Sequence, residues 1–168
     1  MKAMNFGYQH PALEQLHSNK SLWVGHMGAS STDHFAGQTF QCPDEGKLNK
    51  IQVYSMAVPH PGKVILTLHE FDRKAKKWGP ALTSSEIKVD SNDEENWMQF
   101  PIHSVPLHRG NTYGFQLKSP DGLVAIGEAA WTNKHSFNYG EEWSVNNIEN
   151  KDHYYRYFSL AFKVQLRA

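Results

Sequence analysis

Residues 131–143 bring aromatic rings and hydrogen-bonding side chains into one short segment, WTNKHSFNYGEEW. Its aromatic residues are Trp131, Phe137, Tyr139 and Trp143. Its amide, imidazole and carboxylate groups come from Asn133, Asn138, His135, Glu141 and Glu142. Sugar rings present apolar C–H faces that stack on aromatic planes, and their hydroxyl groups bond to amides and carboxylates. We therefore expect this segment to bind carbohydrate.

The expected ligand contacts within this segment are Trp143, Tyr139 and Trp131. Trp143 is flanked by two polar residues and is expected to be the most exposed of the three. Large aromatic residues are often buried, so the alternative is that Trp131 and Phe137 fill the core. Trp78, which lies between a lysine and a glycine, is a further candidate. Its alternative role is to cover the edge of the core.

Glu128 interrupts the apolar run LVAIGEAAW, residues 123–131. A buried charge is costly unless it is paired or faces a ligand, so we include Glu128 among the binding residues. The alternative is an outward-facing glutamate on an edge strand. If Glu128 acted together with a second carboxylate, the chain would be a small glycoside-acting enzyme. The carboxylates available for such a pair are Glu70, Asp72, Glu141 and Glu142.

Other catalytic and metal-binding patterns are missing from the sequence. It has no Gly-x-Ser-x-Gly elbow for a nucleophilic serine, and its single cysteine, Cys42, is expected to be an inert packed thiol. The His-x-His pair of a cupin metal site does not occur either. We therefore favour a noncatalytic protein without a cofactor. A structural calcium could use the oxygens of Asp90, Asn92, Asp93, Glu94 and Glu95, but without fixed ligand spacing a solvated acidic turn is the favoured interpretation.

Two-residue alternation of apolar side chains dominates the sequence and predicts the strands that must position these groups. The clearest cases are residues 63–72, 112–118 and 154–166. In residues 47–58 the alternation changes phase at Lys50–Ile51, which indicates a bulge or bend. About ten short strands with turn signals between them predict an all-β, antiparallel two-sheet β-sandwich of the jelly-roll type. We expect residues 21–168 to form this domain and residues 1–20 to form an N-terminal arm, with only a short helix-like turn at 11–18.

Three stretches resemble a broad group of bacterial jelly-roll domains: residues 36–54, 110–122 and 157–166. They match that group in a Gln-Thr-Phe strand, a Gly-x-x-Tyr strand and a final Leu-Ala-Phe strand, and the match covers roughly residues 34–166. Such domains occur beside secreted enzymes and adhesins, and many look like carbohydrate-binding modules. The matching positions belong to the scaffold, so the resemblance implies the fold more than it implies a ligand. They are Gln38, Thr39, Phe40, Gly110, Tyr113, Leu160, Ala161 and Phe162.

The charge balance of the chain limits its partners. Its 168 residues include 17 Lys plus Arg and 17 Asp plus Glu, so it has no broad positive field to attract nucleic acid. No apolar run is long enough for a membrane span or a signal peptide. The protein is expected outside the cell if a leader has been removed, and in the cytoplasm otherwise. Carbohydrate is the expected partner; the alternative is an adhesin-like or assembly protein that forms oligomers.

Overall fold

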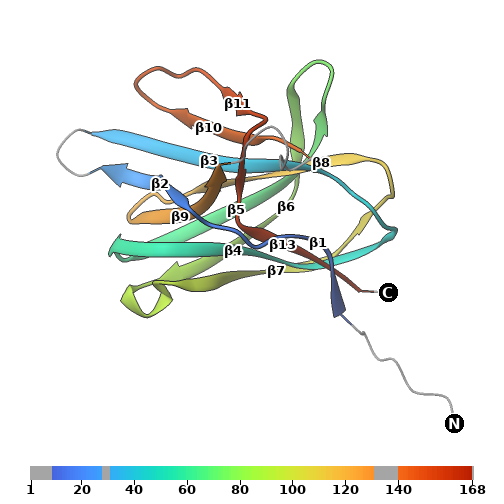
Figure 1. Ribbon diagram of the computed structural model, residues 1–168, viewed down its shortest axis with the longest axis horizontal. Helices are drawn as coiled ribbons and strands as arrows, with labels where there is room; N and C mark the ends of the chain where they lie inside the picture. The colour runs from blue at the N-terminus through green and yellow to red at the C-terminus, as the bar shows by residue number, and fades with distance from the viewer. Residues whose placement is uncertain (1–8, 28–30, 131–139, 168) are drawn as a thin grey trace, which may run out of the picture.

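Figure 1 shows the computed structural model, which describes residues 9–27, 31–130 and 140–167. The described residues form thirteen β-strands and one short 3₁₀ turn, η1 (Ser91–Asp93), and they contain no α-helix. The strands are β1 (Gln9–Gln15), β2 (Lys20–Met27), β3 (Thr32–Gln41), β4 (Gly46–His60), β5 (Gly62–Asp72), β6 (Lys77–Val89), β7 (Asn96–Leu107), β8 (Thr112–Lys118), β9 (Leu123–Ala130), β10 (Glu142–Asn146), β11 (His153–Tyr155), β12 (Phe158–Leu160) and β13 (Phe162–Arg167). Within these ranges no helix is long and apolar enough to cross a membrane. The all-β class predicted from the sequence is confirmed.

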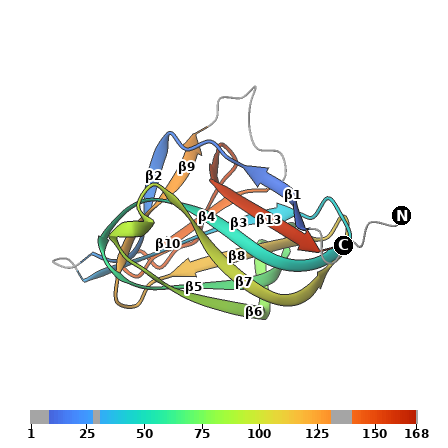
Figure 2. The ribbon, with the colours of Figure 1, turned by 90° about the horizontal axis from the view of Figure 1, so that it is seen from below.

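The strands pair antiparallel in the order β1-β13-β4-β9-β2-β3-β8-β5-β6. Three branches leave this path: β7 pairs with β4, β12 pairs with β9, and β10 pairs with β3 and β11. The sheet curls, so that β5, β6 and β7 lie opposite β2, β9, β1 and β13 (Figure 2). The predicted sandwich has two separate sheets. Here β4 pairs with both β13 and β9, and this joins all the strands into one curled sheet.

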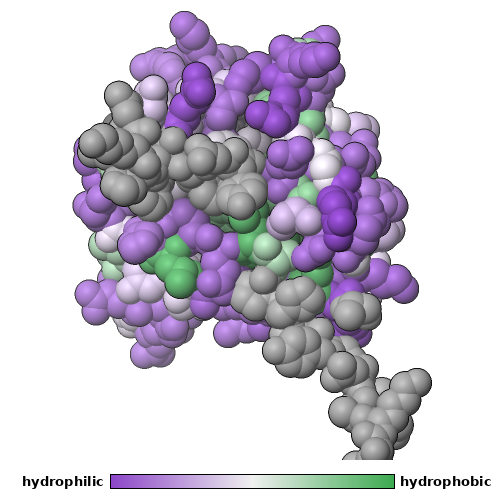
Figure 3. All heavy atoms as spheres, turned by 45° about the vertical axis from the view of Figure 1, so that its right-hand side comes forward, coloured by the Kyte–Doolittle hydropathy of each residue, from purple (hydrophilic) through white to green (hydrophobic). Residues whose placement is uncertain are grey.

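The core fills the inside of this curl. Alternating side chains of β5, β8 and β13 point into it and are fully buried, as the two-residue periodicity predicted. They are Val64, Leu66, Leu68, Tyr113, Phe115, Leu117, Phe162, Val164 and Leu166. Aromatic rings from distant strands meet there, with ring centres 6.1 Å apart for Phe40 and Phe162 and 5.7 Å apart for Phe115 and Phe162. The face of the molecule in Figure 3 is mostly hydrophilic, with hydrophobic residues in small patches.

Two local features of the sheet concern the predictions made above. The pairing of β4 with β7 shifts between Leu48 and Lys50, so that Leu48 and Ile51 are both buried; the predicted bulge is confirmed. The N-terminal segment differs from the expected turn or arm, because residues 9–15 form β1 and pair with β13. The Leu13 side chain lies in the core. This part of the expected arm is therefore a strand of the sheet.

We predict that Phe115→Ala lowers the free energy of unfolding by about 3–5 kcal/mol, because it leaves a cavity between buried rings. Leu82→Ala is the control. Leu82 is 44% exposed on β6, so its truncation should change stability by about 0.5 kcal/mol or less. Equilibrium urea unfolding measures both variants. Equal losses of stability for the two would contradict the assignment of the core.

Candidate functional site

The face of β10, β3, β8 and β5 that points away from the core is called the outer face here. Backbone register sets which residues are neighbours on it. Trp143 of β10 lies opposite Gly37 of β3, which lies opposite Gln116 of β8, and Gln116 lies opposite Thr67 of β5. Side chains at directly opposite positions share a face of the sheet. These four residues therefore form one row across the outer face.

Two tryptophan rings of the outer face pack on glycines. A Cβ atom at Gly37 would lie 3.1 Å from a ring carbon of Trp143, and one at Gly114 would lie 2.6 Å from a ring carbon of Trp78. The two indole rings meet edge to face, with their centres 5.3 Å apart. Because Gly37 makes room for its ring and Trp78 lies against it, Trp143 is only 5% exposed. The expectation that Trp143 is exposed is wrong.

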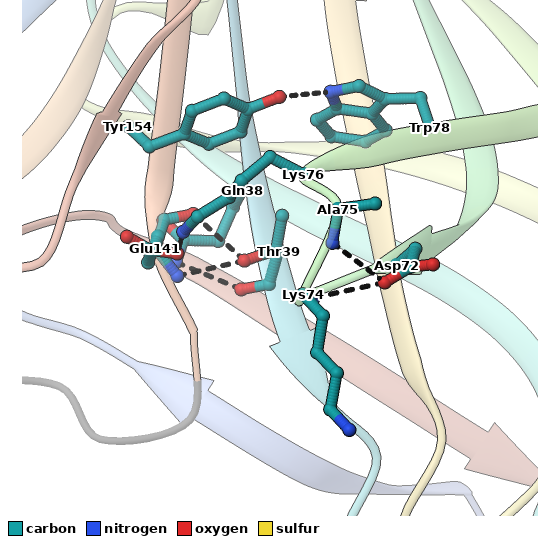
Figure 4. A network of polar contacts seen from close by, with 9 residues as sticks. All are labelled: Gln38, Thr39, Asp72, Lys74, Ala75, Lys76, Trp78, Glu141 and Tyr154. Carbon is teal, nitrogen blue, oxygen red and sulfur yellow. Dashed lines mark hydrogen bonds and ion pairs between the residues drawn. The ribbon is translucent and has the colours of Figure 1, made fainter.

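Trp78 is the centre of an aromatic cluster that also includes Phe71, Tyr154 and His69. Its ring centre lies 4.9 Å from that of Phe71 and 5.4 Å from that of His69. Its Nε1–H donates a hydrogen bond of 3.1 Å to the Tyr154 hydroxyl group (Figure 4). The side chain of Trp78 is half-buried, which agrees with the alternative role of a cover over other residues. Burial is the main cause of a raised pKa at Tyr154.

Hydrogen bonds fix the ring of His69 on the outer face. Its Nδ1 lies 2.8 Å from the Gly79 carbonyl oxygen, and its Nε2 lies 2.8 Å from the Thr67 hydroxyl oxygen. A carbonyl can only accept, so Nδ1 carries the proton of that bond. In the neutral ring Nε2 is then the acceptor, and the Thr67 hydroxyl donates to it. The hydroxyl hydrogen of Thr67 is thereby used within the protein.

The loop between β5 and β6 is attached to the start of β10 (Figure 4). Lys76 forms an ion pair with Glu141, and its ammonium group lies 5.1 Å from the centre of the Tyr154 ring. Glu141 is itself held by β3, since its backbone N–H donates to the Thr39 hydroxyl at 2.9 Å and its carbonyl accepts from the Thr39 N–H at 2.8 Å. The Asp72 carboxylate closes the loop by accepting two backbone N–H groups. These contacts hold Trp78 over the outer face.

The outer face carries two adjoining hollows beside Trp143. The smaller one has a volume of ≈ 70 Å³ and is lined by Phe35, Thr67, Gln116, Leu117, Lys118 and Trp143. The larger one has a volume of ≈ 450 Å³ and is lined by Asp33, His34, Phe35, Ile65, Lys118, Ser119 and Pro120. Phe35 and Lys118 line both, so the two hollows are neighbours. The Nε1–H of Trp143 is buried and has no acceptor within the described part of the chain.

A third hollow lies at the β5–β6 hairpin. Its volume is ≈ 600 Å³, and its lining includes Phe71, Asp72, Trp78 and Asn111. Trp78 therefore borders this hollow as well as covering Trp143. Its other lining residues are mostly charged or polar and come from the hairpin loop and the start of β8.

Glu128 and Glu142 form a buried carboxyl pair on the inner side of the sheet. Glu142 is 1% exposed and Glu128 is 8% exposed. Burial, together with the hydrogen bond and the charge of Glu128, raises the pKa of Glu142 from 4.5 to about 10, so the pair holds a proton at neutral pH. The alternative of an outward-facing Glu128 is wrong, because the pair lies on the side of the sheet that holds Gln38 and Leu160.

This pair does not have the geometry of a glycosidase. The two carboxyl groups of such an enzyme stand about 5–9.5 Å apart, with room between them for the sugar bond or a water. Glu128 and Glu142 share a hydrogen bond instead. Neither residue lines any of the three hollows described above.

The structure also bears on some of the other residues that were named from the sequence. Trp131 and Tyr139 lie outside the described residues. Cys42 is 1% exposed, and burial raises the pKa of its thiol, as expected for a packed cysteine. In the acidic turn, Asp90 caps η1 and the Glu94 carboxylate accepts the Val58 N–H at 2.9 Å. No group of three or more His, Cys, Asp or Glu within the described ranges is placed to hold a metal ion. A bound calcium stays a prediction.

Sequence reasoning missed several residues of the outer face: Phe35, Thr67, Gln116, Lys118 and Tyr154. A signal for Thr67 and Gln116 was present, because both stand at the positions that alternate with buried residues. The sequence does not show that these two positions lie side by side. That depends on the register between β5 and β8.

Comparison with known proteins supports the fold. No protein-family model matches the sequence, and no curated protein matches it significantly. A solved structure of the cysteine protease and lectin-like domains of Cwp84, a surface layer associated protein of Clostridium difficile, is 13% identical with a TM-score of 0.53 and covers 80% of this chain. A structure of the clostridial cysteine protease Cwp84 after propeptide cleavage is 12% identical with a TM-score of 0.62 and covers 95% of this chain. The matches span only 32% and 40% of those longer chains.

We predict that Glu142→Gln makes stability less dependent on pH. The folded protein keeps the Glu142 proton up to about pH 10, whereas the unfolded chain releases it near pH 4.5, so stability falls as pH rises between these values. The fall is at most about 1.4 kcal/mol per pH unit. Gln has no proton to release, and the variant should lose less stability than the parent between about pH 6 and about pH 9.

Urea unfolding across this pH range measures the difference. Glu86→Gln on exposed β6 is the matched control and should follow the parent. Parallel stability profiles for Glu142→Gln and the parent would show that the buried pair holds no extra proton.

Proposed function

We propose that this domain is a noncatalytic binding module that takes carbohydrate in the hollows of the outer face. The observation that carries the proposal is the combination of aromatic walls and polar groups beside Trp143. Ligand sites are concave, mostly apolar and equipped with a few polar groups that orient the ligand. The outer face has these features on a rigid sheet, within reach of solvent.

Different residues of the outer face have different proposed roles. Phe35 and Ile65 are half-buried and offer apolar surface to the C–H face of a sugar ring. Gln116 offers an amide that can donate to or accept from hydroxyl groups. Trp143 is the floor of the site rather than a stacking platform, and Trp78 holds it in place. Glu128 supports β10 from the inner side through its bond to Glu142.

Trp131 and Tyr139 stay in the proposal as ligand contacts. Their segment, residues 131–139, joins β9 to the approach of β10, where Trp143 lies. Aromatic side chains stack on the C–H faces of sugar rings, which is the reason for keeping these two residues in the proposal.

The structural similarities give this proposal further support. Cwp84 is described as having a lectin-like domain and as associated with a surface layer. A jelly-roll arrangement of the curled sheet and a location outside the cell are the matching proposals for this chain. The assembly or adhesin alternative stays a prediction, since nothing described here measures an oligomeric state. The hydrolase alternative loses support from the hydrogen-bonded geometry of Glu128 and Glu142.

Phe35→Ala should weaken glycan binding by up to about tenfold, because it removes one stacking surface from both hollows. A glycan array on the whole chain identifies a bound glycan, and calorimetry then compares the variants. Trp23→Ala is the matched control: Trp23 is 36% exposed on β2 and lines neither hollow, so affinity should not change. A chain that binds no glycan, or an unchanged affinity for Phe35→Ala, would refute the proposal.

A further inference from the structure

We infer that the smaller hollow beside Trp143 accepts a carboxylate, so that the preferred ligand is an acidic glycan such as a uronic acid oligomer. This inference rests on the proposed function and names the ligand class of the same site. It depends on three properties of the hollow: its size, the sign of its polar groups and the unused hydrogen-bond donors in its lining.

The size of the hollow admits a functional group rather than a sugar ring. Its volume is ≈ 70 Å³, and one water molecule takes up about 30 Å³ of liquid. A carboxylate, which has three heavy atoms, fits into the space of about two waters. The ring that bears it would remain in the adjoining hollow of ≈ 450 Å³, against Phe35 and Ile65.

The polar side chains of the smaller hollow are the Thr67 hydroxyl, the Gln116 amide and the Lys118 ammonium group. No Asp or Glu lines it, and its one charged residue is Lys118. The Thr67 hydroxyl group donates its hydrogen bond to His69. Asp33, in the larger hollow, is paired with the His26 ring at 2.8 Å. Within the smaller hollow itself, a positive group without a carboxylate in the same lining favours a ligand that is negative at this point.

Two residues that line the hollow, Trp143 and Lys118, carry donors that are unused within the described structure. Trp143 is only 5% exposed, and its Nε1–H has no acceptor among the described residues. A buried donor without a partner costs free energy that an acceptor on a ligand would recover. The Lys118 ammonium makes no ion pair with any described residue. A carboxylate that meets both donors gains charge-assisted hydrogen bonds, which are stronger than those of a neutral hydroxyl.

Glu86, which stands in the same row of the sheet as Lys118, does not cancel this preference. Ile65 lies between Lys118 and Glu86 in the register of β8, β5 and β6. Glu86 faces Lys63 instead, at 3.9 Å. Lys118 is exposed, so its attraction for an anion is screened by salt, and binding should weaken as ionic strength rises.

The experiment compares glycans that differ only in their charge. The probes are oligogalacturonate and hyaluronan fragments, each beside a neutral counterpart with methyl-esterified or reduced carboxyl groups. Binding to the whole chain is measured by calorimetry at low and high salt. We expect about tenfold tighter binding of at least one acidic probe over its neutral counterpart, because a charged hydrogen bond is lost in the latter.

Two variants test the donors separately. Lys118→Met keeps the length of an exposed side chain and should abolish most of the acidic preference and its salt dependence. Trp143→Phe keeps an aromatic floor without the N–H and should weaken acidic binding about fivefold. Lys88→Met is the control, because Lys88 is exposed on β6 and lines neither hollow. Thermal melts verify that each variant is folded.

The outcomes separate the inference from the proposed function. Glycan binding that is equal for the acidic and neutral probes, or that Lys118→Met leaves unchanged, overturns the inference and leaves the binding module standing. A chain that binds neither these probes nor any glycan on an array overturns both.

Discussion

The outer face depends on two glycines in neighbouring strands. Gly37 and Gly114 lack the Cβ atoms that would collide with Trp143 and Trp78. Without this space, neither indole ring could lie so close to the backbone, and the two rings could not meet. The smaller hollow depends on the same packing, because Trp143 lines it and Trp78 lies against Trp143. The shape of the outer face is therefore determined by missing side chains as much as by those that are present.

Strand β10 connects this surface to the inside of the sheet. Trp143 points outward, whereas its neighbour Glu142 points inward to Glu128, because successive residues of a strand face opposite sides. The bond between the two carboxyl groups ties β10 to β9 from beneath. The ion pair of Lys76 and Glu141 ties the same region to the β5–β6 hairpin from outside. The floor of the site is thus held from both sides of the sheet.

The sequence was sufficient for the core and insufficient for the site. Alternation in residues 63–72 and 112–118 identified the buried positions, because successive side chains of a strand point to opposite faces of the sheet. The site depends on register between distant strands, which alternation does not encode. Trp78 and Tyr154 are hydrogen-bonded although 76 residues separate them. Trp143 was expected to be exposed because its sequence neighbours are polar, but its burial comes from Gly37 and Trp78, which are distant in the chain.

The other differences between expectation and structure have equally local causes. The segment that includes β1 looked helical because Leu13 and Leu16 stand three apart, yet pairing with β13 outweighs this weak preference. The single curled sheet arises from the length of β4, whose fifteen residues reach both β13 and β9. Strand pairing on both sides of one long strand cannot be recognised from its own sequence.

The attachment of β10 to β3 depends on the absence of a side chain at position 140. Gly140 lies so close to the Thr39 carbonyl that any larger residue would overlap it, and Thr39 also bonds both backbone groups of Glu141. A side chain at position 140 would push Glu141 away from Thr39 and displace Trp143, two residues further along the chain. The placement of the ring on the outer face is thus decided partly by an atom that position 140 lacks.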